Sequence, residues 1–139
     1  MKTINEAMNN LRTKTKIPEV IYHYTTIRKY NKIKEDNMIK VNGENLICCT
    51  SNDNFINFNT NPNIVRIQID TKKLSKDLTI KRRDETDPNY VEFENEWDID
   101  FSNSKEKGLK LNQDGIKVDF SLALNNSNEI SYILRKSLK

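Results

Sequence analysis

Residues 20–40 of the chain read VIYHYTTIRKYNKIKEDNMIK, and this stretch carries the strongest pattern in the sequence. Its first six residues alternate in a way that predicts a β-strand, because successive side chains of a strand point to opposite faces of a sheet. The alternation separates two sets of residues: Val20, Tyr22 and Tyr24 on one face, and Ile21, His23 and Thr25 on the other. The only histidine of the chain therefore shares a face with Thr25.

A helix is predicted directly after this strand. Ile27, Tyr30 and Ile33 recur at the spacing of an amphipathic helix, while the residues between them are mostly charged. Asn37 can end the helix, since asparagine tolerates the left-handed conformation of a C-terminal cap.

The rest of the chain reads mainly as short strands. MIKV at 38–41 and LICCTS at 46–51 flank the turn residues NGEN, and we expect these two strands to lie near each other. A polar loop follows, in which Phe55 and Phe58 are predicted to anchor the loop to the body of the domain. Further strands are predicted at 64–70, 78–82, 96–101 and 115–124, a turn of helix at 71–77, a short helix at 4–14, and a strand or helix at 129–138.

The strand EWDIDF at 96–101 has two faces of different character. Trp97, Ile99 and Phe101 form an apolar face that we assign to the core, while Asp98 and Asp100 are expected on the solvated face. Short strands with two or three helices indicate an α+β fold with antiparallel sheets. At 139 residues the chain fits a single domain covering 1–139.

The charges are unevenly distributed along the chain. The net charge of +3 is too small to make nucleic acid the default partner. Basic residues nevertheless crowd one stretch, which is followed by eight carboxylates at 84–100 with no lysine or arginine among them. The basic stretch comprises Lys72, Lys73, Lys76, Lys81, Arg82 and Arg83.

Several classes of function and location are disfavoured. No run of 18 apolar residues exists, and the N-terminal residues lack the apolar core of a signal peptide, so we expect a soluble, cytoplasmic, monomeric protein without a membrane partner. With only three glycines, a glycine-rich phosphate loop is excluded. Cys48 and Cys49 are adjacent, supply no CxxC spacing and are expected to be reduced and buried, so no metal site is predicted.

The order IYHYTTIRKYNKIKEDNMIK, LICCTS, VRIQID and NEWDI resembles small microbial domains of the ADP-ribosyltransferase superfamily, over roughly residues 20–101. The resemblance implies the split antiparallel β-sheet core of that family and NAD as substrate. It implies that His23 bonds a ribose hydroxyl of NAD and that Glu96 stabilises the oxocarbenium-like transition state. It also implies a nicotinamide site lined by Tyr24, Thr25, Thr50 and Ser51, with Arg66 either near a phosphate or on the strand surface.

The chain differs from the family pattern at two places. Many members carry Tyr or Trp at the position of Cys48, where an aromatic ring stacks on nicotinamide. Glu92 and Glu94 have the same parity as Glu96 and remain alternatives for the catalytic carboxylate. Glu96 is preferred because Trp97 follows it.

Two hypotheses about function follow. In the first, the protein is an NAD-dependent ADP-ribosyltransferase that modifies a protein or a nucleic acid, as a toxin, an effector or a phage-encoded modifier would. In the second, the fold lacks catalytic activity and acts as a binding module or inhibitor that uses the basic stretch against an acidic partner. RNA 2′-phosphate transfer to NAD is a third option, but it requires several arginines around the site.

Overall fold

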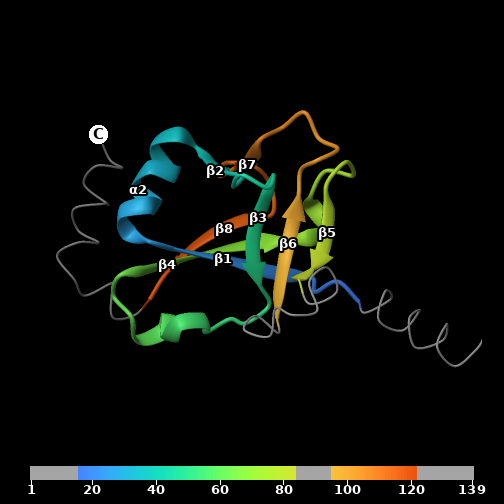
Figure 1. Cartoon of the computed structure of the whole chain (residues 1–139). Coiled ribbons are helices and arrows are strands. Elements are labelled where there is room, and N and C mark those ends of the chain that lie inside the picture. Colours follow the sequence, from blue (N-terminus) through green and yellow to red (C-terminus); the bar gives the residue numbers. More distant parts are fainter. Residues whose placement is uncertain (1–15, 84–94, 122–139) are drawn as a thin grey trace, which may run out of the picture.

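The computed structural model describes residues 16–83 and 95–121 (Figure 1). The elements in chain order are β1 (Val20–Thr26), α2 (Ile27–Asp36), β2 (Met38–Lys40), β3 (Leu46–Thr50), η1 (Phe55–Thr60), β4 (Ile64–Asp70), η2 (Thr71–Lys73), β5 (Thr79–Arg82), β6 (Glu96–Asp100), β7 (Gly108–Lys110) and β8 (Ile116–Phe120). The fold is α+β. Six strands form an antiparallel sheet in the order β5-β6-β3-β1-β4-β8, and β2 pairs with β7 in a second, smaller sheet.

The strand and helix predicted at residues 20–37 are confirmed. Thr26 ends β1 and caps α2, because its hydroxyl accepts a hydrogen bond from the Lys29 amide at 3.3 Å. Asn37 adopts the left-handed conformation, with φ 53° and ψ 35°, and its amide donates to the carbonyls of Ile33 and Lys34. The helix therefore ends at the residue that the sequence indicates.

The six-stranded sheet consists of two three-stranded halves. In Figure 1, β1, β4 and β8 run across the view, whereas β3, β6 and β5 stand upright beside them. β1 and β4 pair along the whole of β1, from Val20 to Thr26, but β1 and β3 pair only through Tyr22 and Thr50. The two halves therefore separate immediately beyond this single junction.

The core lies on one side of both halves and is closed by α2 and the β2-β7 sheet. Its side chains come from every strand of the two halves except the edges, and the residues buried deepest are Ile21, Ile47, Val65, Ile67, Ile69, Ile99 and Phe101. Trp97 is also buried, as predicted, and Phe58 of η1 is 2% exposed and anchors its loop. The alternation predicted for β1 and β4 agrees with this burial pattern, whereas both faces of β6 are buried from Glu96 to Ile99.

Some pairings differ from what the sequence suggests. β2 and β3 follow one another in the chain but are not hairpin partners, since β2 pairs with β7 and β3 pairs with β6 and β1. β7 has no signal in the sequence, because three residues are too few to show a period. The elements expected at 4–14 and 129–138, and Glu92 and Glu94, lie outside the described residues.

Candidate functional site

The junction between the two halves of the sheet brings three strands together. Tyr22 on β1 is the partner of Thr50 on β3, and Thr50 is in turn the partner of Glu96 on β6. Directly paired residues of neighbouring strands project from the same face. Tyr22, Thr50 and Glu96 therefore form a row across the sheet, on the face opposite the core.

A cluster of ionisable side chains lies on the same face, next to this row. Cys48 is the partner of Asp98, and Cys48 Sγ and one carboxylate oxygen each from Glu96 and Asp98 all lie within 4.8 Å of one another. We call these three residues the Cys48 cluster. Glu96 is 8% exposed and Asp98 only 2% exposed, whereas Cys48 opens to solvent.

Two expectations about this cluster are wrong. Asp98 was expected on the solvated side of its strand but is buried, because β6 is an inner strand and Cys48 and Arg83 cover that face. Cys48 was expected to be buried with its neighbour, but only Cys49 lies on the core face. Alternation along β3 explains the difference between the two cysteines.

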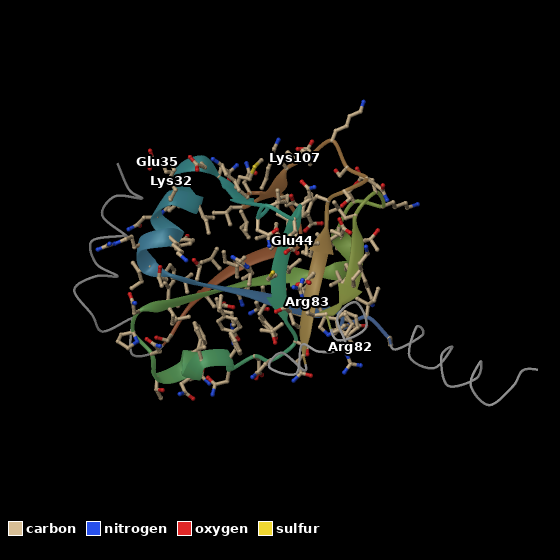
Figure 2. The ribbon with its side chains drawn as sticks, in the orientation of Figure 1. Lys32, Glu35, Glu44, Arg82, Arg83 and Lys107 are labelled. Carbon is tan, nitrogen blue, oxygen red and sulfur yellow. The ribbon has the colours of Figure 1, made fainter. Side chains whose placement is uncertain are left out.

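Arg83 is the counter-ion of the cluster. Its Nη1 lies 3.3 Å from Asp98 Oδ2, and its Nε lies 3.8 Å from Glu96 Oε2. The same Nη1 is 3.7 Å from Glu44 Oε2, and Figure 2 shows Glu44 and Arg83 together over β3 and β6. One guanidinium thus faces three carboxylates, and the local charge is negative.

This environment changes the protonation of two members of the cluster. Burial raises the pKa of Glu96 to about 7; the adjacent Asp98 carboxylate adds to the increase, and Arg83 opposes it. Partial burial also raises the pKa of the Cys48 thiol to about 12, with further contributions from Asp98 and Glu96. The thiol is therefore neutral and a poor nucleophile at neutral pH.

His23 lies on the same face of β1 as buried Ile21 and Thr25, opposite the face that carries the row, and its ring reaches β3 beyond the junction. Its Nδ1 is 2.9 Å from the carbonyl oxygen of Cys48; because a carbonyl oxygen only accepts, the Nδ1–H group donates this hydrogen bond. Burial lowers the pKa of His23, the hydrogen bond to Cys48 opposes the change, and Lys29 adds to it. His23 and Glu96 share no hydrogen bond or ion pair, but they approach the same residue, His23 at the backbone of Cys48 and Glu96 at its side chain.

Thr50 and Ser51 stand where β3 ends at the row. The Thr50 hydroxyl accepts a hydrogen bond from the Asn52 amide at 3.1 Å, and the Ser51 amide donates to the Asn95 carbonyl at 3.0 Å. These hydrogen bonds therefore hold both residues next to the junction between the two sheet halves. Thr25, by contrast, is 8% exposed and lies on the core face of β1.

Tyr24 and Arg66 organise an aromatic wall beside the row. The Tyr24 hydroxyl donates to the Asn52 carbonyl at 2.7 Å, and its ring packs against Phe55 and Phe58. Burial raises the pKa of Tyr24. This wall fixes the loop that follows β3.

Arg66 is neither a bare surface residue nor a free phosphate ligand in this structure. Its guanidinium pairs with Asp119 Oδ2 at 3.2 Å and donates to the Asp53 carbonyl at 2.7 Å. It also stacks over the rings of Phe58 and Tyr22, at 4.5 and 5.1 Å from their centroids. Arg66 therefore joins β8, the loop and β1 on the face that carries the row.

The basic stretch is largely paired within the fold. Lys72 lies 2.8 Å from Glu19, Lys73 lies 3.4 Å from Asp114, and Lys81 lies 2.8 Å from Asp100. Arg83 belongs to the Cys48 cluster. These partners come from three different segments, so these four residues do not form one patch of free positive charge.

Three residues of this site were not assigned to a functional site by the sequence analysis: Tyr22, Asp98 and Arg83. Their parity along the strand places Tyr22 and Asp98 on the faces that they occupy, but only the strand register shows which residues they face.

No family model, curated protein or solved structure matches the chain. Among the described residues, none of the helices has the length and apolar character needed to cross a membrane.

Proposed function

We propose that this protein is an NAD-dependent ADP-ribosyltransferase acting on a macromolecule, either a protein or a nucleic acid. The single observation that carries the proposal is the position of Glu96. It is paired with Thr50 at the junction of the two sheet halves and is withdrawn from solvent on the face that carries Tyr22. A sheet that divides into two halves at this point also agrees with the resemblance noted from the sequence.

The proposed chemistry needs little more than one well-placed negative charge. The bond between the ribose C1′ and nicotinamide breaks, its electron pair leaves with neutral nicotinamide, and C1′ gains positive character. Glu96, as the carboxylate, accepts a hydrogen bond from the ribose 2′-hydroxyl and stabilises that charge. A nucleophilic atom of the acceptor then bonds to C1′ and releases its proton to water.

Other residues would bind the dinucleotide. His23 already uses Nδ1 on the Cys48 carbonyl, which fixes the ring. Because His23 lies on the face of β1 opposite the row, its Nε2 would contact a ribose hydroxyl of a dinucleotide that passes between β1 and β3. Thr50 and Ser51 would lie beneath the nicotinamide. Tyr22, adjacent to Thr50 on the same face, offers the aromatic surface that Cys48 lacks.

The experiment is a labelling assay. The full chain is incubated with labelled NAD and separate protein and nucleic acid fractions from a lysate, and labelled species are identified by mass spectrometry. We expect Glu96→Gln to lower the labelling rate by roughly 10²- to 10³-fold, because it removes the charge that faces the transition state. His23→Ala should reduce labelling chiefly through weaker NAD binding.

Glu106→Gln is the matched control, because Glu106 is exposed and lies outside the site. Wild-type labelling by Glu96→Gln would remove Glu96 from the proposal. No label from the wild-type protein with either fraction would leave the catalytically inactive binding module. The pairing of Lys72, Lys73, Lys81 and Arg83 within the fold weighs against that alternative.

A further inference from the structure

The Cys48 cluster contains residue types that bind metals, although these residues do not have the sequence spacing of a metal-binding motif. Cys48 comes from β3 and the two carboxylates from β6, so no short motif joins them. Their ligand atoms lie within 4.8 Å of one another. Around a tetrahedral Zn²⁺ ion the ligand atoms are about 3.5 Å apart, as Zn–S bonds of about 2.3 Å and Zn–O bonds of about 2.1 Å require.

One buried carboxylate oxygen of the cluster has no hydrogen-bond partner of good geometry, although the neutral Cys48 thiol and protonated Glu96 both interact with the Asp98 carboxylate. Asp98 Oδ1 is buried and has no hydrogen-bond partner among the described residues, whereas Oδ2 of the same carboxylate pairs with Arg83. Buried polar atoms are normally satisfied, and an unsatisfied carboxylate oxygen is costly. Asp98 lies opposite Cys48, so this oxygen is available to a ligand bound between the two strands.

The sulfur atom has a supporting hydrogen bond. Asn42 Nδ2 donates to Cys48 Sγ at 3.8 Å. The Asn42 side chain is itself held in place, because its Oδ1 accepts from the amides of Glu44 and Leu46 at 2.8 and 3.1 Å. A donor directed at sulfur stabilises a thiolate, which is the form that binds metal.

We propose that Cys48, Glu96 and Asp98 bind a thiolate-accepting divalent cation, of which Zn²⁺ is the expected physiological example. A sulfur ligand disfavours Mg²⁺ and Ca²⁺, and mixed sulfur and oxygen ligands suit Zn²⁺. The three negative charges of one thiolate and two carboxylates are balanced by Zn²⁺ together with Arg83, and Glu44, which also faces Arg83, adds one further negative charge. On binding, the Cys48 thiol releases its proton to water.

The site would be open on one side. Three protein ligands leave the fourth position of a tetrahedral ion to water, and exposed Cys48 gives solvent access to that position. Arg83 contacts Asp98 at Oδ2 and thus leaves Oδ1 to the ion. The inference does not depend on the proposed transferase activity, but the two share Glu96, so Zn²⁺ should inhibit any transfer that requires a free Glu96.

The test uses Co²⁺ and Zn²⁺ alone as probes on the full, reduced, metal-free chain. Co²⁺ bound to thiolate gives a charge-transfer band in the near ultraviolet, which carboxylates alone do not give. We expect this band in the wild type and its displacement by Zn²⁺. Cys48→Ser should abolish it, and Asp98→Asn should weaken Zn²⁺ binding by at least about tenfold in calorimetry.

Two control variants separate this site from other ligands. Cys49→Ala removes the buried neighbouring thiol, and Glu106→Gln removes an exposed carboxylate elsewhere; both should keep the band. Far-ultraviolet circular dichroism verifies that each variant is folded. The proposal is overturned if the folded wild type gives no band at saturating Co²⁺, if Cys48→Ser retains the band, or if Asp98→Asn binds Zn²⁺ as the wild type does. These readouts do not involve NAD, so failure of the transferase proposal leaves them unaffected.

Discussion

Glu96 and Asp98 show how strongly position changes the chemistry of a residue. Both occupy the same face of β6, and both are nearly excluded from solvent. Two carboxylates in such an environment cannot both ionise easily, and the pKa of Glu96 accordingly rises to about 7. The residue proposed to carry the reaction therefore changes its charge close to physiological pH.

The first prediction concerns this titration. The proposed reaction needs Glu96 as the carboxylate, so kcat/KM for transfer should fall up to tenfold per pH unit below about pH 7 and level off above it. The measurement is a pH–rate profile recorded with a chelator present. A flat profile between about pH 5.5 and 8.5 would contradict the assigned role of Glu96.

Ile56 in η1 is a second residue whose conformation stands out. It adopts φ 51° and ψ 34°, followed by Asn57 at φ 56°. A β-branched side chain is strained in this left-handed region, and Ile56 is 45% exposed, so it recovers little of the cost by burial.

We therefore expect Ile56→Asn to raise the free energy of unfolding by about 0.5–1 kcal/mol, because asparagine tolerates this conformation. Urea denaturation measures the change. Ile17→Asn serves as the control, since Ile17 is similarly exposed at 42% but lacks a positive φ. Equal effects of the two substitutions would show that exposure, rather than backbone strain, decides the result.

At the scale of elements, the small β2-β7 sheet closes the core above the two sheet halves. It contributes buried Ile39 and Leu109, which pair directly with each other. Its close packing depends on Gly108, where an added Cβ would lie 2.2 Å from the Ile39 carbonyl oxygen. No L side chain fits there without separation of the two strands.

Gly108→Ala should therefore destabilise the protein by about 1–3 kcal/mol, as overpacking in a core does. Gly43→Ala is the matched control, because nothing lies within 4 Å of a Cβ at that turn. Thermal and urea unfolding of the two variants provide the comparison. If Gly108→Ala is as stable as Gly43→Ala, the two strands do not pack as described.

At the scale of the whole molecule, the pairing of the basic stretch bears on binding to polyanions. The basic stretch is distributed among acidic residues on β6, on the turn before β8 and near the start of β1. Such exposed ion pairs contribute little to stability. The two opposite charges of each pair nevertheless largely cancel when they are felt by a charged molecule farther away. In the described part of the chain, these three lysines therefore do not form a patch of unpaired positive charge.

We expect weak binding to polyanions as a result. On a heparin column, the protein should elute below about 0.2 M salt, and Lys72→Gln should change its elution little. Tight retention above about 0.5 M salt would contradict this and favour the binding module. Lys76→Gln is the control, since Lys76 is exposed on the same stretch.

Much of the local structure was predictable from sequence because its causes are local. The alternation at 20–25 and 64–70, the helical spacing after Thr26 and the cap at Asn37 each depend on neighbours in the chain. The candidate site was predicted only in part. Glu96 and Thr50 were named, but their direct pairing was not, and Asp98 was assigned to the solvated face.

The sequence by itself determined which segments form the longer strands, where α2 begins and ends, and which side of β1 and β4 is apolar. Only the tertiary structure decided that Cys48 faces Asp98, that β2 pairs with β7, and that Arg66 joins Asp119 across 53 positions. The physical reason is that strand register is set by long-range packing of whole faces. A residue's own neighbours fix the direction of its side chain, but not the strand that it meets.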